Sequence, residues 1–419
     1  MGSARVYKGE LYGFALDVHS GGITVSNNSN DKLALLLKEI ELPEHAYEAA
    51  KRRYGDLGVW MNRDGCTLDG LDPHIFVQGS FALGTAIRPV EEGQEYDLDL
   101  SCKLRRGVHR TSHTQRQIRD MVGRELESYR AYRNIKEPLE PKHRCWRLNY
   151  QDGLAFHMDV VPGILSNPTR RSELALLLEQ RGVDRRLAED IAADAMWITD
   201  DRSPHFDSIH LDWLSSNPEG YVRWFVSRME GTRRALKMEA QVDDVPVYRR
   251  KSALQQAIQL LKGHRDTMFE HACEYRPISV IVTTLAAQAH VAGESLMETM
   301  ARVLRAFDDF RRSNSDVVLN PVNPAENFAD RWKTAEGRRH QLKENFHRWI
   351  VQVTADFQSV LDQNDPRELV KRAQSGWKVR LNEQKVADAL GAGAGYLTSA
   401  APRRVQIQSP PKPWAGDRF

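Results

Sequence analysis

The chain has 419 residues, 41% hydrophobic and 28% charged, and its 59 basic residues nearly balance 57 acidic ones. This composition excludes a disordered chain, and a formal net charge of +2 disfavours a protein that binds nucleic acid by bulk electrostatics. Four dispersed cysteines without a CxxC pair exclude a disulfide scaffold and disfavour a zinc site. No stretch has the length and apolarity of a membrane span, and the N-terminus lacks a signal-peptide pattern, so we expect a cytoplasmic protein.

The pattern along the chain predicts four segments. Residues 1–30, rich in Gly, Ser and Asn, form an N-terminal extension, and residues 31–165 form a mixed α/β unit that begins with a helix. Residues 166–399 are helical, and residues 400–419 carry four prolines and are expected to be a mobile tail. The fold class is therefore α+β, with a natural ligand cleft between the α/β unit and the helical half.

The N-terminal half predicts two helical stretches and four strands. The first helix follows LALLLKEIELPEHAYEAAKRRY from Asp31, and the strands are HIFVQ at 74–78, EYDLDLSCKL at 95–104, RCWRLNY at 144–150 and LAFHMDVVPGI at 154–164. A charged helical stretch lies between the second and third strands. The last two strands flank Asp152-Gly153, and an Asp-Gly pair between β-prone runs indicates a hairpin.

Beyond Pro162 the pattern predicts helices. They span about 170–196, 218–240, 249–265, 278–291, 294–312 and 327–360. Four aromatic residues follow helical spacing and are expected in the core rather than in a base-stacking platform: Trp213, Tyr221, Trp224 and Phe225.

The strand EYDLDL carries the first chemical signal. Successive side chains of a strand point to opposite faces, so Asp97 and Asp99 share one face. Two carboxylates on one face repel each other unless a cation or solvent relieves them, and together they can ligate one hard cation. A solvated edge strand with two acids explains the same pattern, so further residues must decide.

Two further motifs add to this pair. In FHMDVV, Asp159 interrupts an otherwise apolar strand, and three acids on two strands are the ligand set of a two-metal phosphoryl or nucleotidyl transfer site. Gly79-Ser80 follows HIFVQ, where glycine allows close approach of a phosphate to the backbone and the Ser80 hydroxyl can hold its oxygens.

The order Gly79-Ser80, Asp97-x-Asp99 and Asp159 resembles the polymerase-β-type nucleotidyltransferases. The fuller run FVQGSFALGTAIRPVEEGQEYDLDL resembles the bacterial cyclic-oligonucleotide synthases related to cyclic GMP–AMP synthase, the CD-NTases of antiphage signalling. The C-terminal runs SNPEGYVRWF, LQQAIQLLKGHRD, PISVIVTTLAA and LNPVNPAENFADRW extend the resemblance over roughly residues 35–350.

The resemblance implies a polymerase-β-like core with an N-terminal spine helix and a C-terminal helical bundle. It implies an Mg²⁺-dependent nucleotidyltransferase with two metal ions, for which Mn²⁺ could substitute, that joins ATP, GTP or another nucleoside triphosphate into a cyclic di- or trinucleotide and releases pyrophosphate. This second messenger would activate a downstream effector, and a regulatory protein is a further expected partner.

Carried over residue by residue, the resemblance implies that Asp97, Asp99 and Asp159 are catalytic acids and metal ligands, with Gly79 and Ser80 at the triphosphate. Lys262 matches a family lysine that reaches the triphosphate, and Ser279 at a helix start could touch phosphates; a solvated helix lysine and a simple helix cap explain these two equally well.

Two other functions stay open. One is a transferase that adds a single nucleotide to RNA, a protein or a small molecule; the other is an inactive nucleotide sensor or scaffold. Nucleic acid is not expected to be required, because the cysteine–histidine zinc insertion of the animal DNA sensor is absent. Nucleic-acid binding without catalysis is disfavoured by the charge balance, but the basic run at 103–106 (KLRR) keeps it testable.

Overall fold

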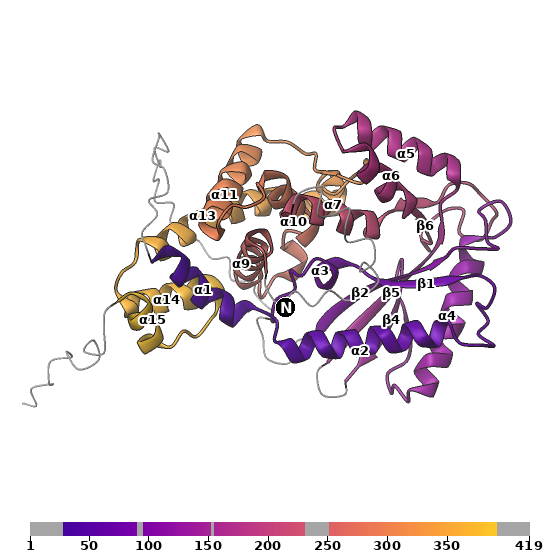
Figure 1. Cartoon of the computed structure of the whole chain (residues 1–419), viewed down its shortest axis with the longest axis horizontal. Coiled ribbons are helices and arrows are strands. Elements are labelled where there is room, and N and C mark those ends of the chain that lie inside the picture. Colours follow the sequence, from indigo (N-terminus) through magenta and orange to yellow (C-terminus); the bar gives the residue numbers. More distant parts are fainter. Residues whose placement is uncertain (1–27, 90–94, 152–154, 231–250, 392–419) are drawn as a thin grey trace, which may run out of the picture.

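A computed structural model describes residues 28–89, 95–151, 155–230 and 251–391. Figure 1 shows a half built on a twisted sheet and a half built of helices, side by side along the longest axis of the molecule. Most of the predicted N-terminal extension and all of the predicted tail at 400–419 lie outside the described residues.

The main sheet holds the functional strands. Its strands are β1 (Pro73–Val77), β2 (Tyr96–Leu104), β3 (Glu140–Pro141), β4 (Trp146–Tyr150), β5 (Phe156–Leu165), β6 (Met196–Ile198) and β7 (Leu214–Ser216). The order is β1-β2-β5-β4-β3, with β6 beside β5 and β7 beside β6, and β2 runs parallel to β5 while the other pairs are antiparallel. The predicted β4–β5 hairpin pairing is confirmed; its Asp152-Gly153 turn lies outside the described residues.

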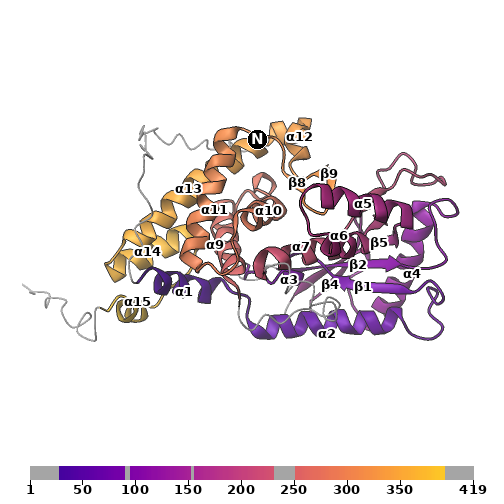
Figure 2. The same cartoon turned by 45° about the horizontal axis from the view of Figure 1, so that its top comes forward.

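Helices cover the sheet on both faces. Figure 2 shows α2 (Glu44–Met61) below the sheet and α7 (Pro218–Glu230) above it. The strands supply alternating apolar side chains for this packing, as in β5, where Phe156, Met158 and Val160 are fully buried. The one-turn helix α3 (Gly79–Ala82) follows β1 directly.

The remaining helices lie around the sheet or form the helical half. They are α1 (Ser29–Ile40), α4 (Gln115–Tyr132), α5 (Pro168–Gln180), α6 (Arg185–Ala193), α9 (Ala253–Met268), α10 (Ser279–Ala289), α11 (Leu296–Ser313), α12 (Ala335–Arg339), α13 (Leu342–Asp362), α14 (Pro366–Trp377) and α15 (Glu383–Ala389). Two short 3₁₀ helices, η2 (Cys273–Tyr275) and η3 (Asp330–Lys333), and the hairpin of β8 (Leu319–Asn320) and β9 (Asn323–Asn327) complete the described elements. Helix α1 packs against α9 and α13 to α15 of the helical half.

Two predicted helices are each divided in two. The predicted helix from Asp31 breaks at Pro43, because a proline disfavours helical backbone at the residue before it. Pro43 is instead the N-cap residue of a second helix, α2. The predicted helix at 170–196 ends early, because Gly182 adopts a φ of +84° and Asp184 caps a new helix, α6.

The predicted helix at 327–360 begins too early. Thr334 caps the short α12, and Gln341, with a φ of +52°, separates α12 from α13. The short strands β6 and β7 and the helices α14 and α15 are not anticipated from the sequence, although Asp365-Pro366 at the start of α14 is a recognisable cap signal.

The expected α+β class, a mixed sheet followed by a largely helical region, is confirmed. Across the described ranges, no helix has the length and apolarity needed to cross a membrane.

Candidate active site

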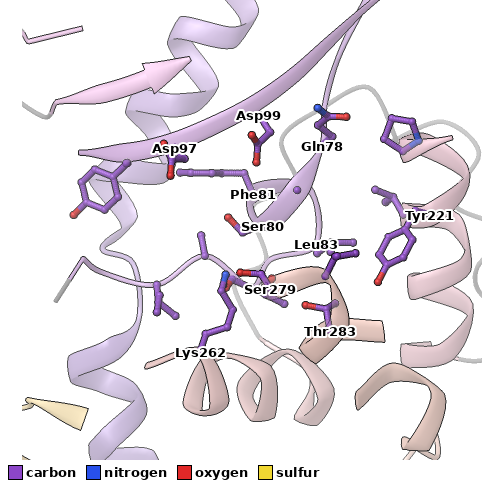
Figure 3. Close-up of a pocket in the computed structure, with 18 of the residues that line it drawn as sticks. Gln78, Ser80, Phe81, Leu83, Asp97, Asp99, Tyr221, Lys262, Ser279 and Thr283 are labelled. Atoms are coloured by element: carbon purple, nitrogen blue, oxygen red, sulfur yellow. The ribbon is translucent and has the colours of Figure 1, made fainter. Parts of the chain in front are cut away.

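Three carboxylates meet where β2 and β5 run side by side. Asp97 and Asp99 alternate with the fully buried Leu98 on β2, and Asp159 on β5 lies in register with Asp99. Neighbouring residues in register point to the same face of a sheet, so the three acids share one face, as the alternation predicts. Figure 3 shows Asp97 and Asp99 facing the pocket from β2.

The electrostatics of Asp99 indicate a cation site. Burial raises the pKa of Asp99 to about 7, and the negative charges of Asp97 and Asp159 contribute to the rise. A carboxylate in this environment is stabilised in its charged form by a cation. Oxygen ligands from three acids are the donor set that Mg²⁺ prefers, so these residues fit the expected metal ions.

Arg147 on β4 is a site residue that the sequence analysis missed. Its Nε lies 2.7 Å from Asp159 Oδ1 and its terminal Nη2 lies 2.8 Å from Asp159 Oδ2, a bidentate pair. The two residues face each other in the β4–β5 register. A two-residue Asp152-Gly153 loop would place Arg147 opposite Met158, one residue away from the observed register, so the hairpin signal alone could not identify this pair.

The turn between β1 and α3 places the predicted phosphate residues beside the acids. Gly79 adopts a φ of +64°, and a Cβ at this position would lie 2.4 Å from Asp99 Oδ2. Glycine is therefore required both for the backbone conformation and for the close approach to β2. Ser80 follows on α3 and faces the pocket (Figure 3).

Helix α9 holds the chain that follows α3. Gln255 donates to the Leu83 carbonyl and Gln259 donates to the Ala86 carbonyl, each at 2.9 Å. Lys262 continues this row one turn further along the helix, and its Nζ donates to the Thr85 carbonyl, also at 2.9 Å. The three residues stabilise the segment behind Ser80 and join it to the helical half.

Lys262 is not the solvated helix lysine of the alternative interpretation. It is 6% exposed and lines the pocket, and burial together with the charge of Arg265 lowers its pKa to about 8. Ser279 is the first residue of α10 but not its cap: the N-cap residue is Ile278, and the Ser279 hydroxyl accepts a hydrogen bond of 2.7 Å from Arg265. The contact of either residue with a triphosphate stays a prediction.

A pocket of about 790 Å³ brings these residues together between the two halves. All predicted site residues line it except Asp159, which reaches the site through its register with Asp99 and its pair with Arg147. Figure 3 shows Asp97 and Asp99 on one side, with Lys262, Ser279 and Thr283 facing them from the helical half.

One predicted core aromatic also lines the pocket. Trp213, Trp224 and Phe225 are buried as expected, and the half-buried Tyr221 on α7 packs against the core while it also faces the pocket (Figure 3). Helical spacing alone could not distinguish the two environments, because the pocket lies against the apolar side of α7.

The basic run at 103–106 does not form a free basic surface. Lys103 is 2% exposed and pairs with Glu219, and Arg105 and Arg106 both pair with Asp72. Two carboxylates thus offset two of the three positive charges of this run.

The fold and the site define a nucleotidyltransferase. The family model described as "Cyclic GMP-AMP synthase DncV-like, nucleotidyltransferase domain" matches residues 73–162, the segment that carries all three acids and Ser80. The chain is 31% identical over 309 residues to a c-di-GMP synthase of Roseivirga ehrenbergii, covering 72% of each protein. It therefore belongs to the CD-NTase family of cyclic dinucleotide synthases.

Other relatives support the same assignment. The cyclic dinucleotide synthase CdnG of Bradyrhizobium diazoefficiens is 25% identical over 337 residues, covering 75% of this chain and 73% of that protein. The structure of CdnG in complex with GTP aligns with a TM-score of 0.61 at 21% identity, over 87% of this chain and 98% of that one. The fold also matches Escherichia coli CdnC bound to a HORMA protein, with a TM-score of 0.53, 13% identity, and 84% and 98% of the two chains covered. The family favours the cyclase over both alternative functions.

Proposed function

We propose that this CD-NTase joins two molecules of GTP into cyclic di-GMP in an Mg²⁺-dependent reaction. The observation that carries the proposal is the convergence of Asp97 and Asp99 with the Gly79-Ser80 turn in one pocket between the two halves, with Asp159 in register beside Asp99. The choice of GTP is supported by the c-di-GMP synthase of Roseivirga ehrenbergii and by CdnG, which was solved with GTP.

The three acids would hold two Mg²⁺ ions, which supply charge stabilisation for the triphosphate and make a ribose hydroxyl easier to deprotonate. The Ser80 hydroxyl and the Gly79 backbone would hold phosphate oxygens of the donor, and Lys262 would leave the Thr85 carbonyl to contact the same triphosphate. Asp97 and Asp99 would orient the donor, while Asp159 would take the proton of the attacking hydroxyl.

The reaction forms one bond and breaks one. The hydroxyl oxygen of the acceptor nucleotide bonds to the α-phosphorus of the donor, its proton passes to Asp159, and the bond to the β-phosphate breaks so that pyrophosphate leaves with the electron pair. The linear intermediate would then rebind with its own triphosphate as the donor, and a second transfer closes the ring. Positioning of the two nucleotides in the pocket can supply about 7–11 kcal/mol of the barrier reduction.

Nucleoside triphosphates are intracellular metabolites, so we place the reaction in the cytoplasm. The cyclic product is expected to activate a downstream effector in antiphage defence. The match to CdnC in its HORMA complex supports, at the level of fold, a regulatory protein as a further partner.

The direct test incubates the protein with Mg²⁺ and α-labelled nucleoside triphosphates, alone and together, followed by phosphatase. We expect a phosphatase-resistant species from GTP alone, and no product from Asp97→Asn or Asp99→Asn. Asp64→Asn, an exposed acid outside the pocket, is the matched control and should retain full activity. Turnover by both site variants, or label transferred to RNA or protein, would refute the assignment.

A further inference from the structure

The pocket extends away from the acids to an aromatic end. In Figure 3, Tyr221 lies on the opposite side of the pocket from Asp97. Phe328, just after β9, also lines the pocket, and its ring centroid lies 6.3 Å from that of Tyr221, with the rings nearly perpendicular. A nucleotide whose α-phosphate lies at the acids directs its base away from them, and aromatic walls bind the face of a base.

This aromatic end holds one carboxylate without a cation. Glu326 on β9 lines the pocket, is exposed, and precedes Phe328 by two residues. Within the described ranges, no basic side chain forms an ion pair with Glu326. The charge of Arg144 acts to lower the pKa of Glu326, but Arg144 forms its ion pair with Asp200. The hydrogen-bond partners of Glu326 are the side chains of Asn320 and Asn323. Each carboxylate oxygen accepts about two hydrogen bonds, so Glu326 keeps acceptor capacity beyond these two, which points to a hydrogen-bond donor in the ligand.

The neighbouring Asn320 fixes the orientation of this carboxylate. Asn320 is 6% exposed, its Oδ1 accepts from the Val322 N–H at 2.9 Å, and its Nδ2 donates to Glu326 Oε2 at 2.8 Å. Because the Val322 contact requires an oxygen, the amide cannot be reversed, and its donor group must face Glu326. The acceptor is therefore held in place before a ligand binds.

We propose that Glu326 recognises the guanine base of GTP by accepting hydrogen bonds from its N1–H and its 2-amino group. This inference rests on the proposed function and names the residue that would select the base. Guanine is the common base that presents two adjacent donors on its Watson–Crick edge, and a carboxylate presents two adjacent acceptors.

The other three bases fit this carboxylate less well. Adenine and cytosine place an acceptor nitrogen beside their amino group, which would face a carboxylate oxygen, and uracil places its one N–H between two carbonyls. A bidentate contact to a base edge discriminates by about 5- to 150-fold.

One carboxylate suffices for both bases of the product. In the first transfer one GTP is the donor and the other is the acceptor, and in ring closure the two nucleotides exchange these positions. Each base therefore occupies the Glu326 subsite once, whichever of the two positions that subsite serves. A symmetric cyclic di-GMP follows from a single selective contact.

The wild-type test compares GTP with two analogues that each remove one donor. Inosine triphosphate lacks the 2-amino group, and N1-methyl-GTP lacks the N1–H. We expect each analogue to lower kcat/KM for pyrophosphate release by about tenfold or more. Equal use of GTP and both analogues would overturn the inference without a mutation, and would leave the cyclase function in place.

The variant test uses Glu326→Gln and Glu326→Ala, with Glu344→Gln on the exposed side of α13 as the matched control. In both Glu326 variants, kcat/KM for GTP should differ from kcat/KM for inosine triphosphate by no more than about twofold. The control should keep the wild-type ratio of these two values. An unchanged ratio in both variants would refute the role of Glu326. If the wild-type protein makes no cyclic product, the proposed function is refuted instead. In that case, the affinities of wild type and Glu326→Gln for GTP and for inosine triphosphate give the same comparison without turnover.

Discussion

Asp99 meets the other two acids and the Gly79 turn at one point of the sheet. Burial and the two neighbouring carboxylates raise its pKa to about 7, whereas an unfolded chain leaves it near 3.8. Between these two values the folded protein holds a proton that the unfolded chain has released. The free energy of unfolding therefore falls as pH rises from about 4 to 7, and this loss persists at higher pH. The site is less stable without a cation, which favours metal binding.

Asp99→Asn should relieve this penalty. For the metal-free proteins, the free energy of unfolding of the variant minus that of wild type should be about 1–2 kcal/mol larger at pH 8 than at pH 5. Solvent in the pocket screens the charges, so this difference is smaller than the full effect of the pKa shift. Urea unfolding at the two pH values measures this difference. Mg²⁺ should raise the melting temperature of wild type at pH 8 and have little effect on the variant. A stability difference that stays constant or shrinks with pH would contradict the repulsion inferred among the three acids.

At the scale of elements, the β1–α3 turn depends on contacts from both halves. The Gln78 N–H donates to the Asp99 carbonyl at 2.8 Å, which joins the turn to β2. From the other side, Gln255 and Gln259 of α9 donate to carbonyls that follow α3. The turn is thus held between a strand and a helix that lie far apart in sequence, and Ser80 has a defined position in the pocket.

Gly79→Ala tests this arrangement. The added Cβ would contact Asp99 and would strain a left-handed backbone, so we expect a loss of about 1–3 kcal/mol in stability and at least about a tenfold loss in kcat. Gly55→Ala in α2 is the control, because a Cβ there meets nothing within 4 Å and helix propensity favours alanine by about 1 kcal/mol. Urea unfolding and initial rates measure both effects. Wild-type activity of Gly79→Ala would show that the close approach to Asp99 is not needed.

At the scale of the whole molecule, a buried ion network joins the sheet to the helical half. Lys103 on β2 pairs with Glu219 in the first turn of α7, and His74 Nε2 on β1 lies 2.9 Å from the other oxygen of Glu219. Burial alone would raise the pKa of Glu219, but the hydrogen bond from His74 and the charge of Lys103 hold it below its usual value. The network positions α7, whose next residues include Tyr221 of the pocket.

Lys103→Met should destabilise the protein by about 3–5 kcal/mol, because it leaves the buried Glu219 with only the weaker His74 partner. The double variant Lys103→Met, Glu219→Leu should recover most of that loss, as measured by urea unfolding in a double-mutant cycle. Lys142→Met removes an exposed ion pair with Glu140 and should cost less than about 1 kcal/mol. Additive effects of the Lys103 and Glu219 substitutions would mean that the two side chains do not stabilise each other.

The sequence alone determined the local features of the site. Strand alternation placed Asp97 and Asp99 on one face, Asp159 followed from an acid in an apolar strand, and Gly79-Ser80 from a glycine after a strand. These features depend on the two-residue period of a strand and on the conformational range of glycine, both of which are properties of a few neighbouring residues.

Only the tertiary structure decided which residues from distant segments share the pocket. Lys262 proved buried rather than solvated, Ser279 proved bound to Arg265 rather than a cap, and Tyr221 proved to line the pocket as well as to pack against the core. Glu326 gave no signal in the sequence, because a carboxylate in a turn-rich segment is usually solvated. The environment of each of these side chains is set by packing between elements far apart in the chain, and helical or strand periodicity carries no information on it.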